Sequence, residues 1–206
     1  MTDITPLFVT RLQRALLPKG VAARLNEDIV AATLSFAEED AAGIGWCREH
    51  SYPGYTSYGS LNDLPSRAPC FAELKKHLDA QAKTFAQALS FDLGGGRLKL
   101  DNLWVNLLEP RGFHAGHIHP HSVISGTYYA QTPKGAAALK LEDPRLPMMM
   151  AAPPRREDAP EADRNFVYVA PEPGMTVMWE SWLRHEVPRN DAKKPRISVS
   201  FNYRWG

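Results

Sequence analysis

The chain has 206 residues, 44% of them hydrophobic and 23% charged, and its formal net charge is +1. This length and composition are typical of one globular domain. Because a net charge near zero provides no basic stripe, we expect neither nucleic acid nor an anionic membrane as the main partner.

The N-terminus and the cysteines bear on the cellular compartment. The segment MTDITPLFVTRLQRALLPKG lacks the continuous apolar stretch of a signal peptide, and no run approaches 18 apolar residues. Cys47 and Cys70 are the only cysteines. We therefore expect a cytoplasmic protein with reduced thiols and no membrane-spanning segment.

The N-terminal part of the chain has the pattern of helices. Apolar residues recur at helical spacing over 21–42 and over about 69–91. The segment between them, SYPGYTSYGSLNDLPSRAP at 51–69, is rich in Tyr, Ser, Gly and Pro and predicts an extended loop.

After LGGG at 93–96 the pattern becomes that of short strands separated by Gly or Pro turns. The strands are expected at 98–108, 122–131, 136–143, 165–171, 175–181 and 196–205. Helices followed by strands predict an α+β, mainly β, single domain over 1–206. In it, a helical part (about 1–95) packs on one side of an antiparallel sandwich or barrel (about 96–206).

One connection is unusually long. Residues 144–164, PRLPMMMAAPPRREDAPEADR, contain five prolines and charges of both signs. Loops of this length are uncommon inside a domain unless they are functional or disordered. We expect a lid, a binding loop or a partly disordered segment.

Four of the seven histidines lie in HAGHIHPH at 114–121. His117 and His119 are two residues apart, so on an extended chain both side chains point to one face and can reach one metal ion. A solvated surface cluster is the alternative, in which these histidines bind nothing. His114 and His121 are expected to face solvent.

Residues much later in the chain complete a possible site. His185 follows a strand-like segment, and Arg196 and Ser198 share one face of the last strand. The planar fork of an arginine fits a carboxylate, and a nearby hydroxyl can add a hydrogen bond. The pattern therefore indicates a metal site beside a carboxylate clamp.

These residues carry a family resemblance. Together with LWVN, HIHPHSVISGTYYA, LEDPR, PEPGMTVMWESWLRHEVPRN and RISVSFNYRW, the pattern resembles the 2OG-Fe(II) oxygenase family found in marine bacteria and their phages, from about Ser51 onward. The resemblance implies a double-stranded β-helix (jelly roll) and an Fe(II)- and 2-oxoglutarate-dependent dioxygenase. Such an enzyme uses O₂, releases succinate and CO₂, and hydroxylates a small molecule or a peptide. A homo-oligomer is a further expectation that remains open.

The resemblance also implies roles for individual residues. His117 and His185 would bind the metal, and His119 would stand where the family has a carboxylate. Arg196 and Ser198 would hold the distal carboxylate of 2-oxoglutarate. Three further residues are candidates for contacts with the cosubstrate: Asn106, Tyr128 and Ser125.

The position of His119 leaves other functions open, because the usual facial triad is two histidines and one carboxylate. Glu180 could supply the missing carboxylate. A three-histidine dioxygenase of the cupin type, which does not use 2-oxoglutarate, is one alternative. A non-catalytic jelly roll that binds a metal or a small acid is another.

Overall fold

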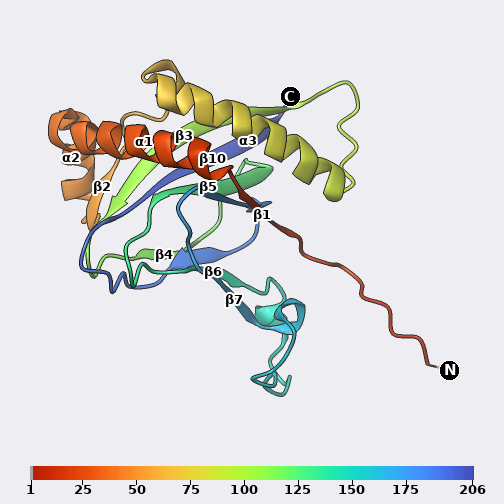
Figure 1. The fold of residues 1–206 in the computed structure, drawn as a ribbon. Coiled ribbons are helices and arrows are strands. Elements are labelled where there is room, and N and C mark those ends of the chain that lie inside the picture. The colour runs from red at the N-terminus through yellow and green to blue at the C-terminus, as the bar shows by residue number, and fades with distance from the viewer. Residues whose placement is uncertain (1) are drawn as a thin grey trace.

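The computed structural model describes residues 2–206 (Figure 1). Its helices are α1 (Lys19–Glu39), α2 (Ala41–Glu49) and α3 (Pro69–Ala88), with short 3₁₀ turns at Leu64–Ser66, Leu146–Met148 and Glu161–Asp163. Its strands are β1 (Leu12–Leu16), β2 (Gly54–Thr56), β3 (Leu98–Leu108), β4 (His114–His117), β5 (Ile124–Gln131), β6 (Leu139–Glu142), β7 (Phe166–Val169), β8 (Met175–Glu180), β9 (His185–Val187) and β10 (Arg196–Trp205).

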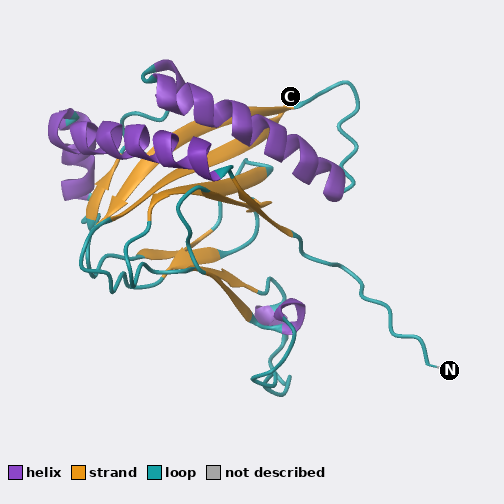
Figure 2. Ribbon diagram, in the orientation of Figure 1, coloured by secondary structure: helices purple, strands orange, loops and turns teal. Residues whose placement is uncertain are grey.

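The strands form two antiparallel sheets. The larger sheet has the order β1-β8-β5-β10-β3-β2, and the smaller has the order β4-β9-β6-β7. In Figure 2 the long helices cover one side of the larger sheet, and the smaller sheet lies on its other side. The prediction of a mainly β chain with helices packed on one side is confirmed.

The side chains of the larger sheet alternate between two environments, as the pleat requires. In β10, Ile197, Val199 and Phe201 point toward the helices and join the main core. Arg196 and Ser198, on the other face, point toward the smaller sheet and line a cavity. The cavity therefore lies between the two sheets.

The helices bury one apolar stripe each. Leu25 and Ile29 of α1 and Phe71, Leu74 and Leu78 of α3 are fully buried in the core that they share with the sheet. Their spacing of three and four residues is the spacing that places side chains on one helix face. α3 begins with proline at its first position, where no backbone donor is lost.

The helix predicted over 21–42 is present, but its predicted end passes the boundary between two helices. α1 ends at Glu39, and α2 begins at Ala41. The side chain of Asp40 accepts a hydrogen bond from the backbone of Gly43 at 3.0 Å, so it caps a new helix. Tyr55 also donates to Asp40, at 2.7 Å, and this tertiary bond holds the break in place.

The segment 51–69 is not entirely a loop, because β2 lies within it and pairs with β3 at the edge of the larger sheet. Strands β1, β4 and β9 were not among the predicted strands either. These four strands have three to five residues each. Such short segments carry too little alternation to be recognised, and they form because neighbouring strands supply hydrogen-bond partners.

Residues 144–164 connect β6 to β7, at the edge of the smaller sheet opposite to β4. In Figure 1 the connection extends away from the body of the molecule. Glu161 forms an ion pair with Arg14 at 2.7 Å, and no residue of 144–164 lines the cavity between the sheets. The segment is thus not placed as a lid over that cavity.

No helix within residues 2–206 has the length and apolar character needed to cross a bilayer.

Candidate metal centre and acid-binding cavity

Three histidines meet at the smaller sheet. β4 pairs with β9 so that His117 and His185 are direct partners across the sheet. His119 follows the end of β4, and its backbone N–H donates to the carbonyl of Ser181 at 3.0 Å. One ring nitrogen from each histidine lies within 4.8 Å of the others. The structure thus brings together the three residues that the sequence indicated as ligands.

The hydrogen bonds of the rings determine which nitrogen carries the proton. Nδ1 of His117 lies 2.7 Å from the carbonyl oxygen of Ala115, and Nδ1 of His185 lies 2.9 Å from that of Leu183. A carbonyl oxygen only accepts, so each Nδ1 carries the hydrogen and each Nε2 keeps a lone pair. This is the tautomer in which an imidazole binds metal through Nε2.

The ring of His119 is fixed in the same way by a side chain. Its Nδ1 lies 2.7 Å from Oδ1 of Asn202, which is an acceptor. Nε2 of His119 then lies 3.3 Å from Nε2 of His185, and neither nitrogen has a hydrogen to donate to the other. A cation bound between converging lone pairs is held by all of them, so this donor set fits a divalent metal ion such as Fe(II).

The surroundings keep the imidazoles of His119 and His185 neutral. Burial, together with neighbouring His117, lowers the pKa of His119 to about 4. Burial likewise lowers the pKa of His185 to about 3. Both rings are therefore available as ligands at neutral pH without losing a proton.

No carboxylate takes part. Glu180 does not belong to the histidine group, and no Asp or Glu within residues 2–206 lines the cavity. The ligand set offered by the described residues is three imidazoles.

The far end of the cavity contains a buried arginine. Arg196 is only 1% exposed, and none of the ion pairs within residues 2–206 includes it. One guanidinium nitrogen donates to Oγ of Ser198 at 3.3 Å, and the guanidinium lies 4.9 Å from the centre of the Tyr129 ring. Its Nε and the hydroxyl of Tyr129 have no hydrogen-bond partner. A buried cation without an acid beside it fits an anionic ligand.

Asn106 also lines the cavity, but its amide is engaged by the protein. Its Oδ1 accepts from Thr56 at 2.9 Å, and its Nδ2 donates to Ser200 at 2.9 Å. The amide spans β2, β3 and β10, which positions the wall on which Ser198 and Arg196 lie.

The prediction for Tyr128 does not agree with its position. Tyr128 points toward the helices, where its hydroxyl donates to Asn26 of α1 at 2.6 Å. Tyr129, the next residue, points to the opposite face and lies against Arg196. Alternation requires the two rings to face opposite ways, and the packing of α1 determines that Tyr128 is the one outside the cavity.

Ser125 is near the metal site rather than among the residues that line the cavity. Its hydroxyl lies 2.7 Å from Oδ1 of Asn202 and 2.7 Å from Oγ of Ser181. It is fully buried, and it contacts the same amide oxygen as His119.

Sequence reasoning missed Asn202, although a signal was available. Asn202 lies four positions after Ser198 on one strand, so it shares the face of Arg196 and Ser198. His114 was also misplaced, because it lines the cavity and accepts or donates a hydrogen bond at 2.7 Å with the hydroxyl of Tyr52. Burial, with the charge of Arg196, lowers the pKa of His114 to about 3.

Aromatic rings flank the histidines. Trp179 lies with its ring centre 4.6 Å from that of His185, and Trp104 lies 6.0 Å from His119. Tyr58, which is half exposed, contacts Trp104 at 5.3 Å. His119 and His185 are thus each flanked by an indole ring.

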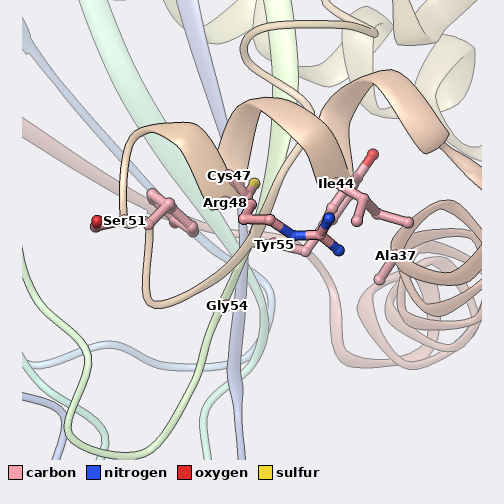
Figure 3. A pocket seen from close by; sticks show the side chains of 8 residues that line it. Ala37, Ile44, Cys47, Arg48, Ser51, Gly54 and Tyr55 are labelled. Carbon is pink, nitrogen blue, oxygen red and sulfur yellow. The ribbon is translucent and has the colours of Figure 1, made fainter.

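A second hollow, of about 400 Å³, lies outside this cavity against α2 (Figure 3). Arg48 extends along it, and Cys47 lies at its inner side. Burial raises the pKa of the Cys47 thiol, so the thiol stays protonated and unreactive. The hollow lacks the converging polar groups of the histidine cavity, although it is larger.

Comparison with known families and structures agrees with this geometry. Residues 102–202 match the model of a family described as "Putative 2OG-Fe(II) oxygenase". Over these 101 of its 206 residues the chain is similar to this family. The matched part of the chain contains His117, His119, His185 and Arg196. Among curated proteins, none matches the chain.

Solved structures share the fold over nearly the whole chain. A prolyl-4-hydroxylase from Pseudomonas putida has 15% identity, with 96% of this chain and 93% of that chain covered and a TM-score of 0.61. AviO1 from Streptomyces viridochromogenes Tue57 has 14% identity, 95% and 90% coverage, and a TM-score of 0.65. SnoN, a non-heme alpha ketoglutarate dependent epimerase from nogalamycin biosynthesis, has 14% identity, 95% and 76% coverage, and a TM-score of 0.62.

Proposed function

We propose that this protein is an Fe(II)- and 2-oxoglutarate-dependent oxygenase that hydroxylates a substrate not yet identified. The observation that carries the proposal is the pairing, in one cavity, of three converging imidazole nitrogens with a buried arginine that lacks an acidic partner. Fold similarity supports it, since SnoN is described in complex with Fe³⁺ and alpha ketoglutarate (16% identity, TM-score 0.61).

The histidines would hold the iron through their Nε2 atoms. The two carboxylates of 2-oxoglutarate would then have different environments, one at the metal and one at Arg196. Ser198 and the free hydroxyl of Tyr129 lie beside that guanidinium and can donate further hydrogen bonds. Because Arg196 lies on β10 and the histidines on or beside the facing β4 and β9, the acid would span the space between the sheets.

Iron bound at this site supplies the redox chemistry by which one oxygen atom of O₂ enters succinate and the other enters a C–H bond of the substrate, with release of CO₂. The chain itself orients the acid and excludes water. Trp179, Val187 and Leu139 line the cavity and are buried, so they would keep solvent from the bound acid.

The substrate would reach the metal from its open side, where His117 is exposed. Tyr58 and Trp104 lie on one side of His119. His119 and Ser181 are joined by a backbone hydrogen bond. Each has an apolar neighbour in the sequence, Ile118 beside His119 and Trp182 beside Ser181, and both neighbours are nearly half exposed. A small molecule or a peptide side chain with apolar surface would fit this border.

The experiment is an oxygen-uptake assay of the iron-loaded protein with 2-oxoglutarate under ¹⁸O₂, followed by mass spectrometry of succinate. One ¹⁸O atom in succinate supports the proposal. Oxygen uptake with a thiol substrate in the absence of 2-oxoglutarate would instead indicate a three-histidine dioxygenase, which the lack of a carboxylate ligand favours. Binding of the acid without oxygen uptake would indicate a non-catalytic domain.

A further inference from the structure

The three histidines are not held in the same way. Nδ1 of His117 and of His185 each bonds to a backbone carbonyl two residues earlier in the chain. Nδ1 of His119 bonds to a side chain, that of Asn202, 83 residues away. The residue that stands in the position of the usual carboxylate is therefore the one whose orientation depends on a distant, replaceable group.

Asn202 belongs to a small hydrogen-bond network in which the donor and the acceptor of each bond can be assigned. Its Nδ2 donates to Oδ1 of Asn102 on β3 at 2.9 Å, so its Oδ1 is turned toward the histidine. That oxygen accepts from His119 and, at 2.7 Å, from Ser125 of β5. Because Ser125 donates to Asn202, its own oxygen accepts from Ser181 at 2.7 Å.

The network is shielded from water. Asn202, Ser125 and Ser181 are at most 6% exposed, so a hydrogen bond lost here is not replaced by solvent. The sheet also holds the amide in place, because Asn202 is the direct partner of Asn102 on one side and of Ser125 on the other. The acceptor oxygen is thus positioned by three adjacent strands before any metal binds.

We propose that Asn202 is a positioning residue that sets the tautomer and the donor strength of His119, and through them the affinity of the site for a divalent metal. The metal part of this inference rests on the proposed function. With Oδ1 as its acceptor, the ring keeps its hydrogen on Nδ1 and presents a lone pair on Nε2. Without that acceptor the hydrogen can move to Nε2, where it points into the metal site.

The first test needs no metal. Nitrogen-15 spectra of the imidazoles in the metal-free protein distinguish a ring protonated at Nδ1 from one protonated at Nε2. We expect His119 to be in the Nδ1–H form in the natural protein and to become a mixture in Asn202→Leu. An unchanged Nδ1–H form in Asn202→Leu overturns the proposal, whatever the protein binds.

The second test is zinc affinity at pH 8, measured by competition with a coloured chelator. Replacement of a group that orients a metal ligand commonly changes metal affinity about 10- to 100-fold. We expect Asn202→Leu to lower zinc affinity by about tenfold or more. Asn202→Asp should raise it by about tenfold, because a carboxylate paired with Nδ1–H makes the imidazole a stronger donor.

The opposite signs matter, because general damage to the sheet lowers affinity in both variants. Tyr203→Phe is the matched control: it removes one side-chain hydrogen bond, to Asp79 at 2.8 Å, from the other face of the same strand. It should leave zinc affinity within twofold. Loss of affinity in both Asn202 variants, or in neither, contradicts the proposal. Absence of zinc binding by the natural protein would instead contradict the metal site itself.

Discussion

Arg196 gives a prediction that separates ligand binding from stability. Its burial strengthens the binding of an anionic ligand, but the same burial of an unpaired charge lowers the stability of the ligand-free protein. It is 1% exposed and has no acidic partner among the described residues. Loss of one partner of a buried, hydrogen-bonded charge pair costs about 2–5 kcal/mol. Arg196→Met should therefore weaken 2-oxoglutarate binding by about 30-fold to several thousand-fold.

The same variant should behave differently when no ligand is present. Methionine fills much of the arginine's volume and removes a buried, unpaired charge, and replacing buried charges by apolar groups is often neutral or stabilising. We expect the free energy of unfolding of the metal-free protein either to stay the same or to rise by about 1–4 kcal/mol. Loss of function and gain of stability in one variant is the signature of a residue kept for a ligand.

Two measurements test this reasoning. Calorimetric titration of the zinc-loaded protein gives the 2-oxoglutarate affinity. Acetate is the control ligand: it lacks a second carboxylate, so it should bind equally to the natural protein and to Arg196→Met. Urea unfolding of the metal-free protein gives the stability. Arg189→Met is the control, because Arg189 is exposed and paired only with Asp191. Unchanged 2-oxoglutarate affinity in Arg196→Met, together with a loss of several kcal/mol of stability, would refute the assignment and make Arg196 a structural residue.

Three further predictions concern the metal, the pH dependence and the thiols. His185→Ala should retain less than about a tenth of the metal, as measured by elemental analysis, whereas exposed His121→Ala should retain all of it. Burial lowers the pKa of His114 to about 3, so below about pH 6.5 the unfolded chain takes up a proton that the folded protein does not. The free energy of unfolding should fall on acidification by up to about 1.4 kcal/mol per pH unit from this residue, and urea titrations of His114→Gln should lack that part of the slope. Cys47 and Cys70 are buried and free, and burial raises the pKa of both thiols; a thiol reagent should modify them much more slowly in the native than in the unfolded protein, and rapid labelling of both would contradict the packing.

The sequence by itself determined the parts of the fold that are encoded locally. The strands at Leu98–Leu108 and Arg196–Trp205 have the bounds that the alternating pattern predicted, and α3 begins at the proline that marks its start. Two-residue spacing indicated the pairs His117/His119 and Arg196/Ser198, and the family resemblance added His185, before any tertiary information. Alternation and spacing depend only on residues close together in the chain, so they can be recognised in the amino-acid sequence.

Tertiary structure decided which environment each face of a strand contacts. Alternation states that Tyr128 and Tyr129 point opposite ways, but only the packing of α1, through Asn26, assigns Tyr128 to the core and leaves Tyr129 beside Arg196. Alternation places Asn202 on the face of Arg196 and Ser198, but nothing in the local sequence indicates its contact with His119. Both contacts join segments that are far apart in sequence, and a hydrogen bond across such a distance exists only once the sheets and helices have come together.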